Sequence, residues 1–178
     1  MKKTVLILCL VSLAALAGFV AEKQAAKMEF DSNTIQIGMI VSDLPASLTF
    51  YKEILGFMQE ADRPSFDVNA DFGKKSGLTD SLPIHVEVLK LGAGSESTQL
   101  KLMTFGEKAK KQENDYISTH TGVQYLTIRV KNLTPFVESI KKHNVKFAGE
   151  TPIPLGDNHF VLVKDPDGTF VELIGPMK

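Results

Sequence analysis

The sequence has a single cysteine and no tryptophan, and its charges nearly cancel, with 20 basic against 21 acidic residues and a formal net charge of -1. The cysteine, Cys9, lies in an apolar N-terminal run, so the rest of the chain cannot form an internal disulfide and depends on packing for its stability. A near-zero net charge supplies no long-range field that would gather nucleic acid. We therefore expect neither a disulfide scaffold nor a nucleic-acid partner.

The N-terminus differs in composition from the rest of the chain. Two lysines precede an apolar run from Val5 to Ala21, and polar residues follow. A basic start, an apolar stretch and the small-residue triplet Ala15-Leu16-Ala17 are typical of a secretory signal peptide. We predict a signal peptide over residues 1–21, a linker over 22–33, and a secreted or periplasmic protein. The run is also long enough for an uncleaved anchor, an alternative that would be the only link to a membrane.

Two segments of the sequence share one pattern. Residues 35–44 (IQIGMIVSDL) and 124–133 (QYLTIRVKNL) alternate with period two, as strands do, and end near Asp43 or Asn132, which can cap a helix. An amphipathic stretch with proline in its first turn follows each segment, PASLTFYKEILGF in the first copy and TPFVESIKKHNVKF in the second. The sequence therefore contains one strand-helix unit twice.

Further strand candidates follow each unit, at Pro83–Leu91 and Thr98–Phe105 in the first half and at His159–Val163 and Thr169–Ile174 in the second. The last two flank Asp165-Pro166-Asp167-Gly168, and because proline favours the second position of a type I turn and glycine its end, they should form a β-hairpin. Each half is therefore a predicted βαβββ-like module.

The two halves together predict an α+β domain over residues 34–176. Module one covers residues 34–106 and module two covers residues 121–176. Neither half alone buries much apolar surface, so we expect the modules to pack into one domain.

Strand parity assigns the candidate site residues to faces, because a step of one residue moves a side chain across the sheet. Apolar positions such as Ile37, Leu126 and Leu173 should pack on the helices. The opposite face of each strand would then carry the polar candidates Gln36, His85, Glu87, Lys101, Tyr125, Arg129, His159 and Glu172. Such residues are more often a solvated sheet face, but a curved, repeated fold would gather them into a concave site.

The segments SDLPASLTFYKEILGF and VKDPDGTFVELI, with the internal repeat, resemble the glyoxalase/bleomycin-resistance/extradiol-dioxygenase superfamily, also called the vicinal oxygen chelate (VOC) superfamily. The resemblance spans residues 34–176. It implies two βαβββ modules that form a curved mixed sheet around a cavity, and homodimers in some members. It often implies a divalent metal, held by His or Gln on each module's first strand and by Glu on its last.

The resemblance puts the metal positions at Gln36, Lys101, Tyr125 and Glu172. Gln36 and Glu172 match the family's ligands, whereas Lys101 replaces a Glu and Tyr125 replaces a His or Gln. A lysine ammonium repels a divalent cation and a neutral phenol binds it poorly, so the set falls short of the three protein ligands of a catalytic zinc. We expect no metal or other cofactor, and an ion pair between Lys101 and Glu172 in the metal's place.

Two functions remain open. In the first, an exported, metal-free protein binds a small, anionic molecule through Gln36, Lys101, Tyr125, Arg129 and Glu172. In the second, it is a glyoxalase-like lyase or isomerase, or a dioxygenase, with a non-standard site whose catalytic candidates are Glu172, Tyr125 and His85. A metal site rebuilt from His85 and His159 with Glu87 or Glu172 belongs to this second alternative. We favour binding, because the family's metal-ligand set is incomplete.

Overall fold

The computed structural model describes residues 28–106, 109–111 and 113–178. The chain divides into one unit at residues 1–31 and a second, compact unit at residues 32–178, and the fold below is that of the second unit. The predicted signal peptide lies outside the described residues. Within the described part of the chain, no helix combines the length and the apolar character that crossing a membrane requires.

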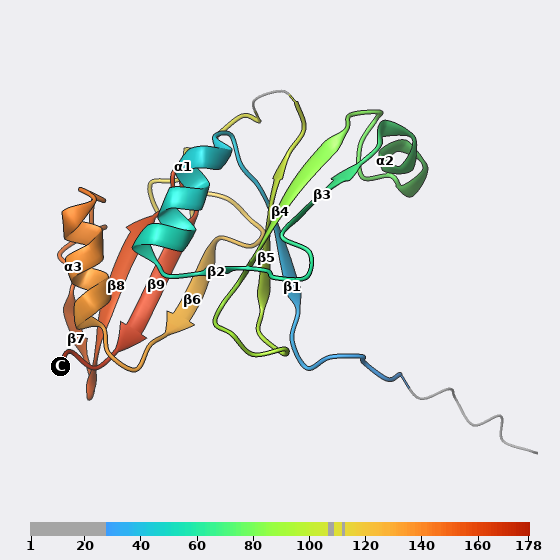
Figure 1. The fold of residues 1–178 in the computed structure, drawn as a ribbon. Helices are drawn as coiled ribbons and strands as arrows, with labels where there is room; N and C mark the ends of the chain where they lie inside the picture. The colour runs from blue at the N-terminus through green and yellow to red at the C-terminus, as the bar shows by residue number, and fades with distance from the viewer. Residues whose placement is uncertain (1–27, 107–108, 112) are drawn as a thin grey trace, which may run out of the picture. The chain divides into compact units, whose positions relative to one another are not determined.

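Residues 32–178 contain two separate mixed sheets (Figure 1). Sheet A has the order β1-β5-β4-β2, with β3 also paired to β4; its strands are β1 (Gln36–Ile40), β2 (Met58–Gln59), β3 (Ser65–Val68), β4 (Ile84–Lys90) and β5 (Gln99–Thr104). Sheet B has the order β6-β9-β8-β7, with β6 (Tyr125–Arg129), β7 (Ile153–Leu155), β8 (Asn158–Lys164) and β9 (Phe170–Gly175). In both sheets the first strand runs parallel to the last, and the other pairs are antiparallel.

The fold class and the paired modules are thus as predicted, but the single curved sheet is not. Each module's first strand pairs with the last strand of the same module, β1 with β5 and β6 with β9, so each module completes its own sheet. No ladder joins sheet A to sheet B among the described residues. The modules are instead joined by packing and side-chain hydrogen bonds.

The two predicted helices form, with different starts and ends. The first is α1 (Leu44–Leu48), which continues as the π-helix η1 (Thr49–Ile54), and the second is α3 (Thr134–Lys142). Asp43 caps α1 as predicted, accepting a hydrogen bond from the Ala46 amide at 3.0 Å. Asn132 lies one residue before the N-cap of α3 and accepts instead from the Thr134 amide at 3.1 Å, so the predicted cap is displaced by one residue.

The segment between β2 and β4 adds a strand and a helix to module one. It contains β3 and the helix α2 (Ala70–Ser76), and Asn69 caps α2 by accepting from the Phe72 amide at 2.8 Å. Strand β3 extends sheet A by pairing antiparallel with β4. Module one therefore carries an additional strand that module two lacks in the described residues.

One hydrophobic core is shared by the two modules. Module one contributes residues such as Val41, Leu89, Leu100 and Leu102, and module two contributes residues such as Val137, Ile140, Val161 and Leu173. Tyr51 of η1 is fully buried in this core, and its ring meets Phe50 and Phe57 edge-on with centroid distances of 5.1 and 5.6 Å. The shared core makes residues 32–178 one packed unit.

The predicted hairpin turn at Asp165–Gly168 forms, and it also fastens module two to module one. The Asp165 carboxylate accepts from the Asp167 and Thr169 amides at 3.0 and 2.8 Å, and from the Tyr51 hydroxyl at 2.9 Å. The Asp167 carboxylate accepts from the Ser42 amide at 3.0 Å and from its hydroxyl at 2.5 Å. We call Ser42, Tyr51, Asp165 and Asp167 the module junction.

Burial strengthens the coupling at the module junction. Asp165 is 5% exposed, and burial raises the pKa of its carboxyl although the hydrogen bonds from Tyr51 and the Thr169 amide act to lower it. Burial, followed by the neighbouring charge of Asp165, also raises the pKa of the Tyr51 phenol well above its usual value. The phenol therefore stays protonated and donates to Asp165.

Removing the Tyr51 hydroxyl should destabilise the protein, because the Tyr51→Phe substitution leaves one oxygen of a buried carboxyl without its donor. We expect the free energy of unfolding to fall by about 1–3 kcal/mol in urea denaturation. The matched control is Tyr116→Phe, since Tyr116 is 74% exposed and its side-chain hydroxyl has no hydrogen bond to a described residue. Equal stability of the two variants would show that the hydrogen bond from Tyr51 to Asp165 contributes nothing.

Candidate functional site

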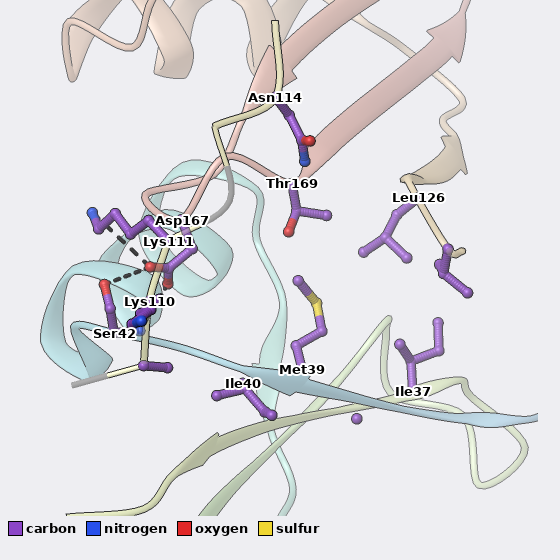
Figure 2. A pocket seen from close by; sticks show the side chains of 13 residues that line it. Ile37, Met39, Ile40, Ser42, Lys110, Lys111, Asn114, Leu126, Asp167 and Thr169 are labelled. Atoms are coloured by element: carbon purple, nitrogen blue, oxygen red, sulfur yellow. Dashed lines mark hydrogen bonds and ion pairs between the residues drawn. The ribbon is translucent and has the colours of Figure 1, made fainter. Parts of the chain in front are cut away.

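A cavity of about 350 Å³ lies between the two modules, and we call it the inter-module cavity (Figure 2). Module one supplies the edge strand β1 and Ser42, which follows it. Module two supplies residues before and within β6 together with the end of the hairpin turn. Ala109, Lys110, Lys111 and Asn114 of the connecting segment supply the rest. The cavity exists because β1 and β6 do not pair, which leaves their edges apart.

The floor of the inter-module cavity is apolar. Ile37 and Met39 reach from β1 toward Leu126 of β6, as Figure 2 shows. All three side chains are half-buried and pack against the shared core. A ligand in this cavity would therefore meet a fixed hydrocarbon surface.

The rim of the inter-module cavity is polar. Asn114 is 9% exposed, and its side-chain oxygen has no hydrogen-bond partner among the described residues. Its backbone carbonyl is held by the Lys164 ammonium, so the residue is anchored while its amide oxygen stays free. Lys111 donates to the Pro166 carbonyl at 2.8 Å, whereas the exposed Lys110 has no hydrogen bond to a described residue. The rim thus offers one buried acceptor and one available cation.

The four positions predicted for a metal do not meet in one cavity. Gln36 and Lys101 line a second cavity of about 310 Å³ on sheet A, which we call the sheet-A cavity. Tyr125 and Glu172 line neither cavity and belong to sheet B, where Tyr125 is 44% exposed. Arg129, also predicted to bind ligand, is exposed four residues beyond Tyr125, at the end of β6.

Strand register nevertheless shows that each position in module one has an equivalent position in module two. Gly38 pairs with Lys101 on sheet A, and Thr127 pairs with Glu172 on sheet B. Lys101 and Glu172 therefore occupy matching places in the two modules, as do Gln36 and Tyr125, each two residues before the paired position. This confirms the repeat that the sequence predicted.

The predicted ion pair between Lys101 and Glu172 is not formed. Glu172 accepts a hydrogen bond from the Thr127 hydroxyl at 2.5 Å on the adjacent strand. Lys101 makes no ion pair or hydrogen bond with any described residue. The prediction failed because it assumed that both modules enclose one site, whereas each residue lies on its own sheet.

The predicted faces of His85 and Glu87 are also wrong. His85 pairs with Thr104 and Glu87 with Leu102, whereas Lys101 pairs with Val88, so the two acid-base candidates lie on the other side of sheet A from Lys101. Strand parity assigned the wrong face because β4 buries apolar residues on both sides of sheet A. Ile84, Val86 and Val88 pack in a small second cluster with Phe66 and Met103 rather than against the helices.

His159 likewise does not face a cavity with the polar candidates. It lies on the same face of β8 as Val161 and Val163, which are fully buried in the shared core, and it pairs with Gly175, whereas Glu172 pairs with Leu162 on the opposite face. Its Nδ1 atom is buried without a hydrogen-bond partner among the described residues. A metal site rebuilt from His85 and His159 together is therefore contradicted, because the two lie on different sheets.

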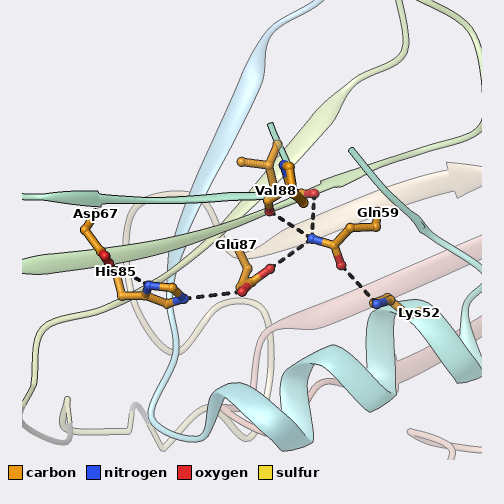
Figure 3. A network of polar contacts seen from close by, with 7 residues as sticks. Lys52, Gln59, Asp67, His85, Glu87 and Val88 are labelled. Atoms are coloured by element: carbon orange, nitrogen blue, oxygen red, sulfur yellow. Dashed lines mark hydrogen bonds and ion pairs between the residues drawn. The ribbon is translucent and has the colours of Figure 1, made fainter. Parts of the chain in front are cut away.

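His85 instead belongs to a polar network that parity did not predict (Figure 3). Its Nδ1 lies 2.7 Å from Asp67 of β3 and its Nε2 lies 3.3 Å from Glu87. Gln59 donates to Glu87 at 2.9 Å and accepts from the Lys52 ammonium at 2.9 Å. The network links β3, β4, β2 and η1. Among the described residues, no group of three or more His, Cys, Asp or Glu is arranged to hold a metal ion.

The hydrogen bond to Asp67 is the largest influence on His85 and raises the pKa of its imidazole, with Glu87 adding to the effect and partial burial opposing it. The folded protein therefore holds this proton more tightly than the unfolded chain does. Its stabilising effect is fully present below the unfolded value of about 6.5 and is lost as pH rises through the higher folded pKa.

Comparison of the sequence with known protein families identifies its relatives. The model of the Glyoxalase/Bleomycin resistance protein/Dioxygenase superfamily matches residues 34–173. The chain belongs to this superfamily. A search of curated protein sequences finds no match.

Solved structures of glyoxalase relatives share the fold. A glyoxalase family protein from Bacillus cereus matches with a TM-score of 0.66 and 16% identity, covering 86% of this chain and 99% of its own. A glyoxalase/dioxygenase from Nostoc punctiforme matches with a TM-score of 0.55 and 23% identity, covering 80% and 90%. The trypanothione-dependent glyoxalase I of Leishmania major matches with a TM-score of 0.53 and 26% identity, covering 79% and 84%.

The residues of this member do not fit the metal that the superfamily implies. Of the four equivalent positions, only Gln36 and Glu172 offer oxygen donors suited to a divalent ion, and they lie on different sheets. Lys101 contributes a cation at the position where a carboxylate would be needed. We therefore derive no chemical step through a metal.

The His85 network should make stability depend on pH. We expect the free energy of unfolding of the wild type, measured in urea, to fall more between pH 5.5 and pH 8.5 than that of His85→Gln. The difference should be less than about 1 kcal/mol, because solvent screens a side chain this exposed. His120→Gln, in the exposed connecting segment, should follow the wild type. Parallel pH profiles for the wild type and His85→Gln would refute this role.

Proposed function

We propose that this superfamily member binds a small organic molecule in the inter-module cavity and needs no metal to do so. The observation that supports the proposal most is Asn114, which lines a cavity with an apolar floor and whose buried side-chain oxygen has no partner among the described residues. A buried acceptor without a donor costs about 1–3 kcal/mol. A ligand that supplies the donor would recover that energy.

The chemistry of the inter-module cavity restricts the ligand. A volume of about 350 Å³ is at the small end of the range for ligand pockets. Ile37, Met39 and Leu126 favour a compact apolar body, such as a ring or a short branched chain. Asn114 favours a hydroxyl or N–H donor, and Lys110 at the rim favours an acidic group. The proposed ligand is therefore a small hydroxy or amino acid with an apolar body.

The setting of this function is also a proposal. The apolar run ahead of residue 22 supports export to a secreted or periplasmic location, with an uncleaved N-terminal anchor as the alternative. The balanced charge supports a small-molecule partner rather than nucleic acid. Pairing into a homodimer is a further proposal, suggested by the superfamily.

A second candidate function is a lyase, isomerase or dioxygenase with a non-standard site. The 26% identity to a trypanothione-dependent glyoxalase I favours it. Tyr125 and Glu172 also lie on the same face of adjacent strands, where Glu172 is a candidate base. The Glu172 carboxylate already accepts a hydrogen bond from the Thr127 hydroxyl. Ligand binding therefore remains the better supported proposal.

Ligand binding should depend on Asn114 and on the free volume beside Leu126. In a thermal-shift screen of small hydroxy and amino carboxylic acids with chelator present, we expect at least one compound to stabilise the wild type. Asn114→Leu should weaken that compound about tenfold or more, because a buried hydrogen bond is lost. Leu126→Trp should abolish binding by filling the cavity.

Matched variants separate these effects from general damage. Asn33→Leu and Leu155→Trp make the same changes at exposed positions outside the cavity and should bind like the wild type. If no compound stabilises the protein, or if Leu126→Trp binds as well as Leu155→Trp does, the inter-module cavity is not the site.

Metal alone should not stabilise the protein. We expect Ni²⁺, Zn²⁺ and Mn²⁺, each added singly to chelator-treated protein, to leave the thermal midpoint unchanged, because Lys101 and Tyr125 replace two of the four expected ligands. Equilibrium dialysis with elemental analysis should find well below about one ion per chain. Stoichiometric binding, with stabilisation that chelator reverses, would favour the enzyme candidate.

A further inference from the structure

The sheet-A cavity combines two cations that have no ion-pair partner among the described residues with a buried acid, Glu60, whose charge the protein already compensates. Gln36 is the cavity's only lining residue from β1, and the cavity shares no lining residue with the inter-module cavity. Its walls include Val88 and Phe66 beside Gln99 and Lys101. It is therefore a separate site, with its own chemistry.

The buried acid in the sheet-A cavity, Glu60, already has hydrogen-bond donors and a cation within the protein. Glu60 is 8% exposed. Its carboxylate accepts from the backbone N–H of Ala61 at 2.9 Å and from the side-chain amide of Gln99 at 2.8 Å. Lys90 lies 3.4 Å from the same carboxylate. Burial acts to raise the pKa of Glu60, but these partners together hold it below its usual value. The negative charge of Glu60 is thus compensated within the protein.

The cations Lys101 and Arg63 have no such compensation. Lys101 is half-buried, and no described carboxylate lies within ion-pair distance of its ammonium. Arg63 stacks its guanidinium on the Phe66 ring, 3.9 Å from the centroid, and makes no ion pair with a described residue. The one other acid at this cavity, Asp62, is exposed, so solvent screens its repulsion.

We propose that the sheet-A cavity binds a small carboxylate, held by Lys101 and Arg63. A guanidinium and an ammonium are the side chains best suited to a carboxylate, and hydrogen bonds to charged groups are the stronger ones. The side-chain amide of Gln36, which has no hydrogen bond to a described residue, can donate to the same anion. The resemblance puts a metal-binding carboxylate at the position of Lys101 in other members of the superfamily. In this chain the position is cationic, and it would bind an anion instead.

The apolar wall adds a preference for the body of the ligand. Val88 is 3% exposed, and the Phe66 ring carries Arg63 on its face. A planar aromatic body can pack on this wall while its carboxylate reaches Lys101. Benzoate is therefore a suitable probe, and the neutral, similarly shaped benzamide is its control.

The test is a titration of purified, isotopically labelled protein followed by amide NMR at constant ionic strength. Benzoate should shift the amide signals of Gln36, Val88 and Gln99 to saturation, and benzamide should not. Lys101→Met should weaken benzoate about tenfold or more, since a charge-assisted contact is lost. Lys101→Arg should keep the affinity within about threefold, because the charge remains.

Two controls keep this result separate from the proposed function. Lys142→Met removes an exposed lysine of α3 and should leave benzoate binding unchanged. Leu126→Trp, which fills the inter-module cavity, should also leave it unchanged. The proposal is overturned if benzoate gives no saturable shift, if Lys101→Met binds as the wild type does, or if the shifts cluster at Asn114 and Leu126 instead.

Discussion

The hydrogen bond from Tyr51 to Asp165 is the contact on which the arrangement of the two modules depends. It joins the π-helix of module one to the hairpin of module two inside a shared core, and the neighbouring contact from Ser42 to Asp167 fixes the end of β1 against the same turn. With these positions set, β1 and β6 are held near each other without pairing. The inter-module cavity is a consequence, because its walls are the unpaired edge of β1 and the residues that the turn presents.

Much of the fold could be predicted from the sequence because local chemistry determines it. The Asp165–Gly168 turn has a proline and a glycine where a type I turn needs them, and Asp43 is placed to cap α1. The insertion after β2 could not be assigned, because β3 is defined by its pairing with β4, a contact between strands that no local pattern reports. The separation into two sheets was missed for the same reason.

The candidate site was less predictable, and parity explains where the prediction failed. Parity identifies a buried face only when the other face is polar, and β4 buries Val86 and Val88 on one side and Leu89 on the other. His85 was therefore assigned to the wrong side. Lys101 was recognised as a departure from the family pattern, but its surroundings depend on Arg63 and Glu60, which lie far from it in the sequence. Asn114 gave no sequence signal, because its importance comes from burial alone.

The position of the module junction in the chain also bears on the order of synthesis. Ser42 and Asp167 are separated by 125 residues, and Tyr51 and Asp165 by 114. Helix η1 and strand β1 therefore leave the ribosome long before the turn that they contact exists. Module one has all the strands of its own sheet by residue 104, but the carboxylate that accepts from Tyr51 is made only near the end of the chain. The two modules can join only when translation is nearly complete.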